Sequence, residues 1–256
     1  MTLAPDTQWD DQEIVFTHMS PDTQFVFDRM TEATLAAVAP RPGERILDVA
    51  CGRGIDAVRL ARQGGQLFGL EPSATMAQKA NEWLAGPEPF VRIARGLAEA
   101  LPFADRVFDK VVCKGAIDHF VSIERTLSEM ARVCKPGGRI IISVANFESL
   151  SCRLARWLDG RKSRGQEPRA KRAFWEMPED HNFRFGPGFL RQSLEPYSRI
   201  ESLTGVSLLW GFPGWGQRLE KVSPASSTFI LHRLDWAARR IPAWADVLVA
   251  VAVPHG

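Results

Sequence analysis

The sequence has few cysteines, almost no net charge and no long apolar run. Its four cysteines form no C-x-x-C pair and no histidine cluster completes a zinc spacing, so neither a structural zinc site nor a disulfide framework is expected. The 32 lysines and arginines against 30 aspartates and glutamates leave a formal net charge of +2, which is too small to indicate nucleic-acid binding by charge alone. No run of about 18 consecutive apolar residues occurs, so no membrane-spanning segment is expected.

The first residues also lack the pattern of a secretory signal peptide. Residues 1–11 carry acidic side chains and no apolar run. Together with cysteines that are expected to be free thiols, this predicts a protein of the reducing cytoplasm. The 256 residues, 45% of them hydrophobic, are enough for one α/β domain with additions.

Short apolar runs alternate with segments of helical periodicity. The runs have the length of strands and cover residues 45–49, 66–70, 91–95, 108–113, 139–144 and 247–253. Ser73 and Ser122 are suitable N-caps for the helices that follow them. Alternating strands and helices predict a doubly wound parallel sheet, covered on both faces. Ligands bind such sheets at the carboxyl ends of the strands.

The chain is expected to form a single domain with three parts. Residues 1–40 form a helical cap, residues 41–146 the cofactor-binding core, and residues 147–256 the rest of the sheet with inserts around the substrate pocket. A basic stretch at residues 161–172 could attract an anionic acceptor or a lipid surface, or form a solvated loop.

A glycine-rich loop follows the first predicted strand. Gly52-x-Gly54-x-x-Ala57 fits the dinucleotide-binding fingerprint, which is a weak signal by itself. Asp48, at the end of that strand, would repel a pyrophosphate but attract an ammonium group such as that of S-adenosylmethionine. Glu71, at the end of the second strand, could accept hydrogen bonds from both hydroxyls of a ribose.

Four segments in the same order and spacing resemble the motifs of class I, Rossmann-like S-adenosylmethionine-dependent methyltransferases of the small-molecule type. They are residues 45–54, 68–76, 96–103 with Phe108-Asp109, and 129–139. The resemblance covers about residues 41–145. It implies a seven-stranded sheet, mostly parallel, with an antiparallel last hairpin and with inserts after the fifth and sixth strands. It also implies S-adenosylmethionine as cofactor and S-adenosylhomocysteine as product.

The resemblance assigns roles to matching positions. The methionyl end of the cofactor would lie on the glycine loop, the ribose on Glu71, and the adenine beside the second and third motifs. The cofactor-binding residues expected on this basis are Asp48, Ala50, Gly52, Gly54, Glu71, Pro72, Met76, Ala98, Glu99 and Cys113. Leu97 departs from the family pattern, because many relatives carry there an acid that bonds the adenine amine.

Candidate acceptor-side residues follow the fourth predicted strand. His119 is the candidate general base, because histidine gains and loses a proton near neutral pH, and Asp118 could orient it. Each could equally be structural or face solvent. Lys114 could neutralise an acidic acceptor, and His181, in the Asp180–Phe185 segment, could bind the acceptor.

Two further interpretations concern the acceptor pocket. Trp215, in an aromatic insert, could line a lid over a hydrophobic acceptor, or fasten the insert to its own domain. A metal site made of His119, His181 and an acid is conceivable, but no metal is expected.

The sequence therefore predicts methyl transfer to a small-molecule oxygen, nitrogen or carbon acceptor, hydrophobic or anionic, with no nucleic acid as partner. The alternatives are a nicotinamide-dependent oxidoreductase on the same fold, an RNA methyltransferase, and a protein that binds S-adenosylmethionine without turnover. The first leaves Asp48 and the motifs after Gly96 unexplained, and the second lacks an appended RNA-binding domain.

Overall fold

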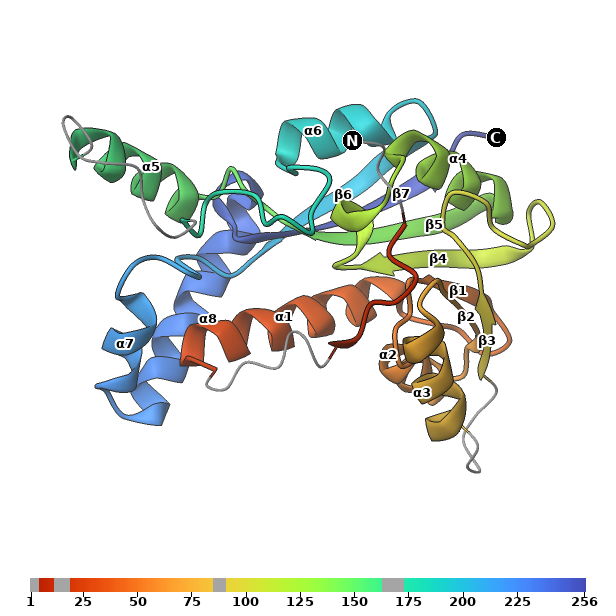
Figure 1. The fold of residues 1–256 in the computed structure, drawn as a ribbon, viewed down its shortest axis with the longest axis horizontal. Coiled ribbons are helices and arrows are strands. Elements are labelled where there is room, and N and C mark those ends of the chain that lie inside the picture. Colours follow the sequence, from red (N-terminus) through yellow and green to blue (C-terminus); the bar gives the residue numbers. More distant parts are fainter. Residues whose placement is uncertain (1–4, 12–18, 85–90, 163–172) are drawn as a thin grey trace.

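The computed structural model describes residues 5–11, 19–84, 91–162 and 173–256. Within them, seven strands form one sheet in the order β3-β2-β1-β4-β5-β7-β6 (Figure 1). The strands are β1 (Arg45–Val49), β2 (Gln66–Glu71), β3 (Val91–Arg95), β4 (Phe108–Lys114), β5 (Cys134–Ala145), β6 (Ser198–Val206) and β7 (Val247–Pro254). Strands β1 to β5 are parallel to one another, whereas β7 runs antiparallel to both β5 and β6. The predicted seven-stranded Rossmann-like sheet with a final antiparallel hairpin is confirmed.

The strands form where apolar runs are bounded by turn residues. In β1, Ile46, Leu47 and Val49 are fully buried, which is typical of a parallel strand covered on both faces. Helix α4 (Ile123–Val133) ends where β5 begins at Cys134, and the Pro136-Gly137-Gly138 turn lies inside β5 as a bulge opposite β4. The strand predicted at residues 139–144 therefore begins earlier than expected.

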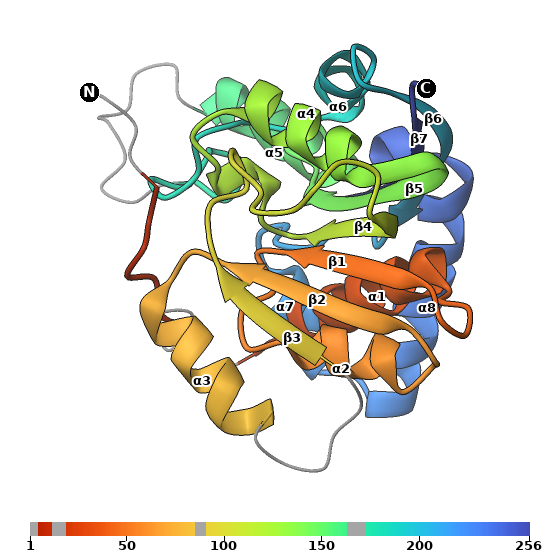
Figure 2. The ribbon, with the colours of Figure 1, turned by 90° about the vertical axis from the view of Figure 1, so that its right-hand side faces the viewer.

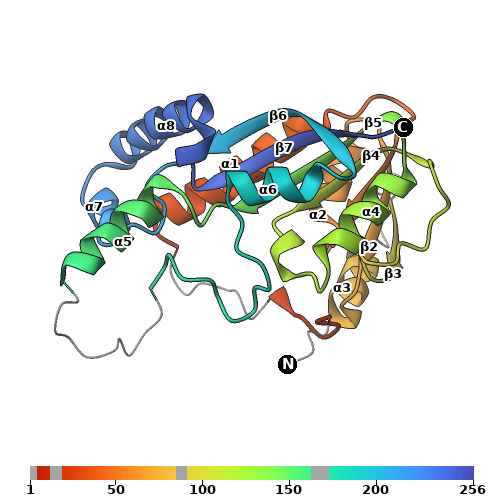
Figure 3. The ribbon, with the colours of Figure 1, turned by 90° about the horizontal axis from the view of Figure 1, so that it is seen from above.

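Helices cover both faces of the sheet (Figures 2 and 3). On one face lie α1 (Pro21–Val38), α2 (Ile55–Ala61), α3 (Ala74–Leu84) and α8 (Pro224–Arg240). On the other lie α4 and α6 (Pro187–Leu194), which contact each other and β5 and β6 respectively. Successive residues of β1 point to opposite faces, so Ile46 packs with α1 and α2 while Leu47 packs with α4 and α6. Asp48, two residues after Ile46, lies on the α1–α2 face.

The remaining elements lie beyond β5 and β6. Helix α5 (Leu150–Lys162) follows β5, while α7 (Trp215–Glu220), α8 and the short turn η3 (Pro242–Trp244) connect β6 to β7. In Figure 1, α5, α7 and α8 lie at the end of the molecule away from β2 and β3. The helical cap is represented by α1, and residues 163–172 of the basic stretch lie outside the described residues.

Two predicted helix caps are confirmed. The Ser73 hydroxyl accepts a hydrogen bond from the backbone N–H of Met76, and that of Ser122 from the N–H of Arg125 (3.3 Å each). Both fix the start of a helix next to the carboxyl end of a strand. No helix among the described residues is long and apolar enough to cross a membrane.

Helix α8 packs closely on β6 at a glycine. A Cβ atom at Gly205 would lie 2.4 Å from the carbonyl oxygen of Ala238 and 2.6 Å from the Cβ of Ala245. We expect Gly205→Ala to lower the free energy of unfolding by about 1–3 kcal/mol, the usual cost of overpacking. Chemical denaturation measures the change.

Gly188→Ala is the matched control, because a Cβ at Gly188 in α6 meets no atom within 4 Å and alanine favours the helix. It should leave stability equal or slightly higher. Equal stability of the two variants would contradict the close packing of α8 on β6.

Candidate functional site

The glycine loop joins β1 to α2 in a tight turn. Three of its residues have left-handed backbone conformations, with φ of 59° at Ala50, 54° at Gly52 and 71° at Gly54. The N–H of Cys51 donates to the carbonyl of Leu70 (3.0 Å), which ties the loop to the end of β2. A Cβ at Gly54 would lie 2.9 Å from the Cδ1 of Ile93. The loop therefore needs glycine at Gly54 both for its backbone angle and for space.

Buried carboxylates gather beneath this loop. Asp48 is 5% exposed and Glu71 4%. Burial, together with the negative charges of Asp56 and Glu71, raises the pKa of Asp48 to about 8, and nearby Lys114 offsets only part of this. Such an excess of negative charge in a buried place favours a cationic ligand group.

Lys114 is paired within the site. Its ammonium lies 2.5 Å from the Asp56 carboxylate and donates to the Thr31 hydroxyl at 3.0 Å. Neutralising an acidic acceptor, the role expected from the sequence, would require breaking this pair. In the described structure, Lys114 links β4 to α1 and α2.

The Glu71 carboxylate supports the glycine loop. It accepts hydrogen bonds from the backbone N–H of Gly52 (2.9 Å) and of Ser73 (2.8 Å). Burial raises the pKa of Glu71 and these two N–H groups lower it, with a net rise. A carboxylate has further lone pairs for a ribose, but this loop-supporting role was missed by the sequence reasoning.

The N-terminal strap, residues 5–11, lies against the loop and the start of α3 (Figure 2). The N–H of Ala74 donates to the Thr7 carbonyl (3.1 Å), and the Ser73 hydroxyl donates to the Trp9 carbonyl (2.6 Å). Arg53, in the glycine loop, forms an ion pair with Asp11. The sequence reasoning missed the strap, because nothing local marks a short polar segment as a partner of a distant loop.

Other predicted cofactor residues line the same strand ends. Met76 is buried, and its Cε lies 3.5 Å from the position of a Cβ at Gly52. Pro72 follows Glu71 directly and precedes α3. Ala98 is buried in the core on the α4–α6 face. The Glu99 carboxylate accepts from the N–H groups of Val121 and Ser122 (2.8 and 3.4 Å), just before α4.

Cys113 is fully buried in β4. Burial and the charges of Asp48 and Asp118 raise the pKa of its thiol. It therefore remains a neutral thiol between the two acidic groups, in contact with the core rather than available as a nucleophile.

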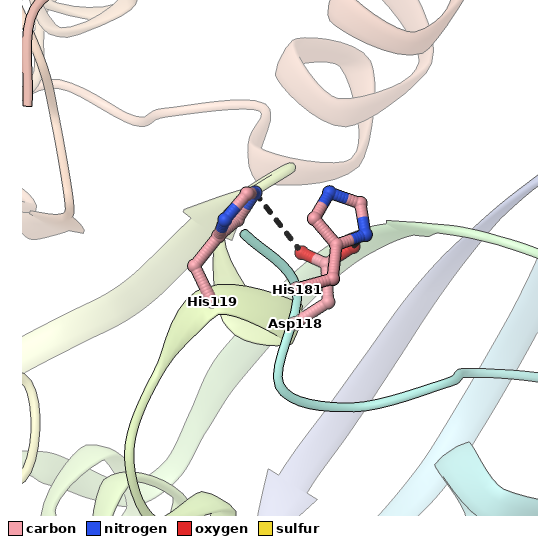
Figure 4. A group of neighbouring side chains, drawn as sticks. All are labelled: Asp118, His119 and His181. Atoms are coloured by element: carbon pink, nitrogen blue, oxygen red, sulfur yellow. Dashed lines mark ion pairs between the residues drawn. The ribbon is translucent and has the colours of Figure 1, made fainter. Parts of the chain in front are cut away.

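Asp118, His119 and His181 form the imidazole–carboxylate cluster (Figure 4). Asp118 and His119 lie in the short turn η2 (Ile117–His119) after β4, whereas His181 comes from the loop before α6. The Nε2 of His119 lies 3.9 Å from one Asp118 oxygen and the Nδ1 of His181 3.5 Å from the other. The two rings meet edge to face, with centroids 4.3 Å apart.

Asn182 fastens the two halves of this cluster together. Its backbone N–H donates to the Asp118 carbonyl (2.7 Å), and its side-chain amide donates to the carbonyls of His119 (2.8 Å) and Phe120 (3.1 Å). Three hydrogen bonds from one residue thus hold the His181 loop on η2. Sequence reasoning missed Asn182, whose partners lie more than 60 positions earlier.

Trp215 lies elsewhere in the fold. It begins α7, which packs on α1 and α8. Gly216, next to it, approaches Ser20 and Asp22 at the start of α1. A role of Trp215 over the acceptor stays a prediction.

The sequence is similar to a known domain family and to characterised relatives. Residues 47–142 match the family model described as "Methyltransferase domain". The chain is 40% identical over 110 residues to a demethylmenaquinone methyltransferase of Clavibacter sepedonicus, covering 43% of this chain and 44% of the relative. A protein of the same name from Symbiobacterium thermophilum is 41% identical over 107 residues and is covered to 42%. The chain thus matches less than half the length of these relatives.

Solved structures share the fold over nearly the whole chain. A Thermotoga maritima protein described as a SAM-dependent methyltransferase, possible histamine N-methyltransferase, superposes with a TM-score of 0.58 at 19% identity, covering 90% of this chain and 89% of that one. At this identity, the likeness concerns the fold alone. Domain match, relatives and fold agree: residues 47–142 match a methyltransferase domain, and the chain resembles the class I S-adenosylmethionine-dependent methyltransferases.

Proposed function

We propose that the protein transfers a methyl group from S-adenosylmethionine to a small-molecule acceptor. The observation that carries the proposal is the pair of buried carboxylates, Asp48 and Glu71, with the half-buried Asp56 nearby, at the glycine loop of a methyltransferase domain. This charge arrangement would repel a pyrophosphate and suits a ligand with an ammonium group and a sulfonium. It argues against nicotinamide-dependent oxidation.

The residues present fit the cofactor. Asp48 would hold the ammonium of the methionyl part, with Ala50, Gly52 and Gly54 allowing its close approach to the backbone. Glu71 would receive the ribose, and Pro72, Met76 and the Ala98-Glu99 backbone would enclose the adenine. When bound, S-adenosylmethionine supplies a methyl group on a sulfonium, whose thioether leaves as a neutral group without acid catalysis.

The acceptor side requires orientation and, for an O–H, N–H or C–H acceptor, removal of a proton. The Nδ1 of His119 lies 3.0 Å from the Asp180 carbonyl oxygen, which can only accept, so Nδ1 carries the hydrogen. The Nε2 of neutral His119 then has a free lone pair that can take the proton of the acceptor. Asp118, 3.9 Å away, would stabilise the imidazolium formed.

A small molecule is the acceptor that the relatives favour. The relatives named demethylmenaquinone methyltransferase act, by that name, on a quinone. The similarity to them covers at most 43% of the chain, and the methyltransferase domain match spans residues 47–142. The acceptor-side loop with His181 and Asn182 lies outside that domain match. This supports methyl transfer, as in those relatives, but to an acceptor particular to this chain.

The first prediction concerns the charge of Asp48. In the folded chain its pKa is about 8, against an ordinary value of 3.8 for this side chain. Between these pH values the folded chain holds a proton that the unfolded chain has lost, so this group makes stability fall as pH rises. Asp48→Asn removes the group that lowers stability as pH rises, and we therefore expect a higher melting temperature at pH 7. The same change should weaken S-adenosylmethionine binding by roughly 10- to 100-fold, the value of a hydrogen bond to a charged group, as measured by calorimetry.

Asp109→Asn is the control. Partial burial acts to raise the pKa of Asp109, but hydrogen bonds from Lys135 and the Arg45 N–H outweigh it and lower the pKa. This variant should therefore lose stability at pH 7 and keep its affinity for the cofactor. Unchanged affinity in Asp48→Asn would refute the site.

A second prediction follows for proton release. A cationic group beside Asp48 lowers its pKa, so cofactor binding near pH 6.5 should release up to one proton per site. Calorimetric titrations in two buffers of different ionisation enthalpy measure the number of protons released. Any S-adenosylmethionine binding that remains in Asp48→Asn should release no proton. Equal proton release by the wild type and by Asp48→Asn would assign the proton to another group.

The third prediction concerns His119. We expect His119→Gln to lower turnover by roughly 100- to 10,000-fold, the usual contribution of a general base, while S-adenosylmethionine affinity stays unchanged. S-adenosylhomocysteine formation is measured with an acceptor selected from a panel of quinones, phenols and amines. His232→Gln is the control, because His232 lies on α8, away from η2, and packs against Phe25 of α1. Wild-type turnover in His119→Gln would make His119 structural.

A further inference from the structure

We propose that Asp118, His119 and His181 bind one divalent transition-metal ion on the acceptor side of the site. The three residues offer two imidazole nitrogens and one carboxylate, and one ligand atom from each lies within 4.8 Å of the others. This set of side chains is not part of any sequence motif, since the turn and the loop that supply it are far apart in the chain.

The spacing of the cluster suits a shared ion better than direct hydrogen bonds. The nitrogen–oxygen separations are 3.5 Å for His181 and 3.9 Å for His119, whereas hydrogen bonds measure roughly 2.7–3.2 Å. Ligands about 2.0–2.2 Å from a tetrahedral ion are about 3.3–3.5 Å from one another. The two imidazoles face different oxygens of Asp118 and the ligand atoms lie within 4.8 Å of one another, so side-chain shifts of about 1 Å would bring all three groups onto one ion.

The Asp118 carboxylate provides a separate indication of a ligand. Asp118 is 3% exposed, and its Oδ1 has no hydrogen-bond partner among the residues that the structure describes. A buried carboxylate oxygen without a partner is costly. An ion between this oxygen and the two imidazoles would remove that cost (Figure 4).

The outer contacts of His119 are those of a metal ligand. Its Nδ1–H donates to the Asp180 carbonyl at 3.0 Å, and the Asp180 carboxylate lies 3.8 Å from the same nitrogen. Metal-binding histidines usually donate their second ring N–H to a carbonyl or carboxylate, which fixes the tautomer and the ring. The Nε2 lone pair of His119 is thereby directed to the side of Asp118.

The cluster is also held in place before any ion arrives. Asn182 joins η2 to the His181 loop through the three hydrogen bonds described above. The Phe183 N–H also donates to the Asp118 carbonyl at 3.1 Å. A site supported by neighbouring hydrogen bonds loses little conformational entropy on binding.

The chemistry of the ligands selects the kind of ion. Two imidazoles and a carboxylate suit Zn²⁺, Co²⁺ or Mn²⁺, whereas Mg²⁺ and Ca²⁺ prefer oxygen ligands throughout. Three protein ligands leave coordination positions open. In the ion-loaded protein an acceptor hydroxyl would occupy one of them and lose its proton to water, whereas His119 serves as the general base when no ion is bound. This last point rests on the proposed function, whereas ion binding does not.

The test is metal binding to untagged, chelator-treated protein. Calorimetry with Zn²⁺ and absorption spectroscopy with Co²⁺ should show one ion per chain, with Co²⁺ bands typical of nitrogen and oxygen ligands, and no comparable binding of Mg²⁺. We expect His119→Gln and His181→Gln each to weaken binding by roughly 100-fold or more, because loss of an outer contact alone costs 10–100-fold. Asp118→Asn should do the same, with circular dichroism as a check of folding.

His232→Gln and His255→Gln are matched controls, because His232 packs on Phe25 and His255 bonds the Glu195 carbonyl. Both should bind the ion normally. Failure of the wild type to bind either ion, or equal affinity in the His119 and His181 variants, would overturn the inference. S-adenosylmethionine binding is measured in parallel, so that loss of metal binding with intact cofactor binding contradicts only the metal site.

Discussion

The hydrogen bonds of the buried Glu71 carboxylate organise the cofactor side of this protein. Its two oxygens hold the Gly52 N–H of the glycine loop and the Ser73 N–H at the start of α3. The loop, the helix and the strap bonded to Ser73 therefore share one anchor. Charge-assisted bonds of this kind are among the stronger polar contacts in a protein interior, which explains how a loop with three left-handed residues is held in one conformation.

The acceptor side depends on a second connection of the same nature. Asn182 holds the loop that carries His181 against the turn that carries Asp118 and His119. The two sides meet at β1 and β4, where the charges of Asp48 and Asp118 both act on the buried Cys113. The carboxylates proposed to hold the cofactor thus adjoin the imidazole–carboxylate cluster proposed for the acceptor side, and methyl transfer needs this adjacency.

Much of the fold could be predicted because its signals are local. Strands β1 and β3 have the predicted bounds, and Ser73 and Ser122 cap the helices expected of them. The start of β5 was placed too late, since a Pro-Gly-Gly turn usually ends an element but here forms a bulge that pairs Cys134 with Phe108. The paired state of Lys114 and of Arg53 could not be foreseen, because their partners come from α1, α2 and the strap.

Local patterns in the sequence specify the alternation of strands and helices, the glycine loop and the acids at the ends of β1 and β2. These follow from periodicity and from residues close together in the chain, which the backbone brings to one edge of a parallel sheet. Three features come from long-range packing instead: Glu71 supports the loop, the strap lies against the loop, and His181 joins Asp118 and His119. Those contacts join segments far apart in the chain, and their geometry depends on how whole elements pack rather than on any local pattern.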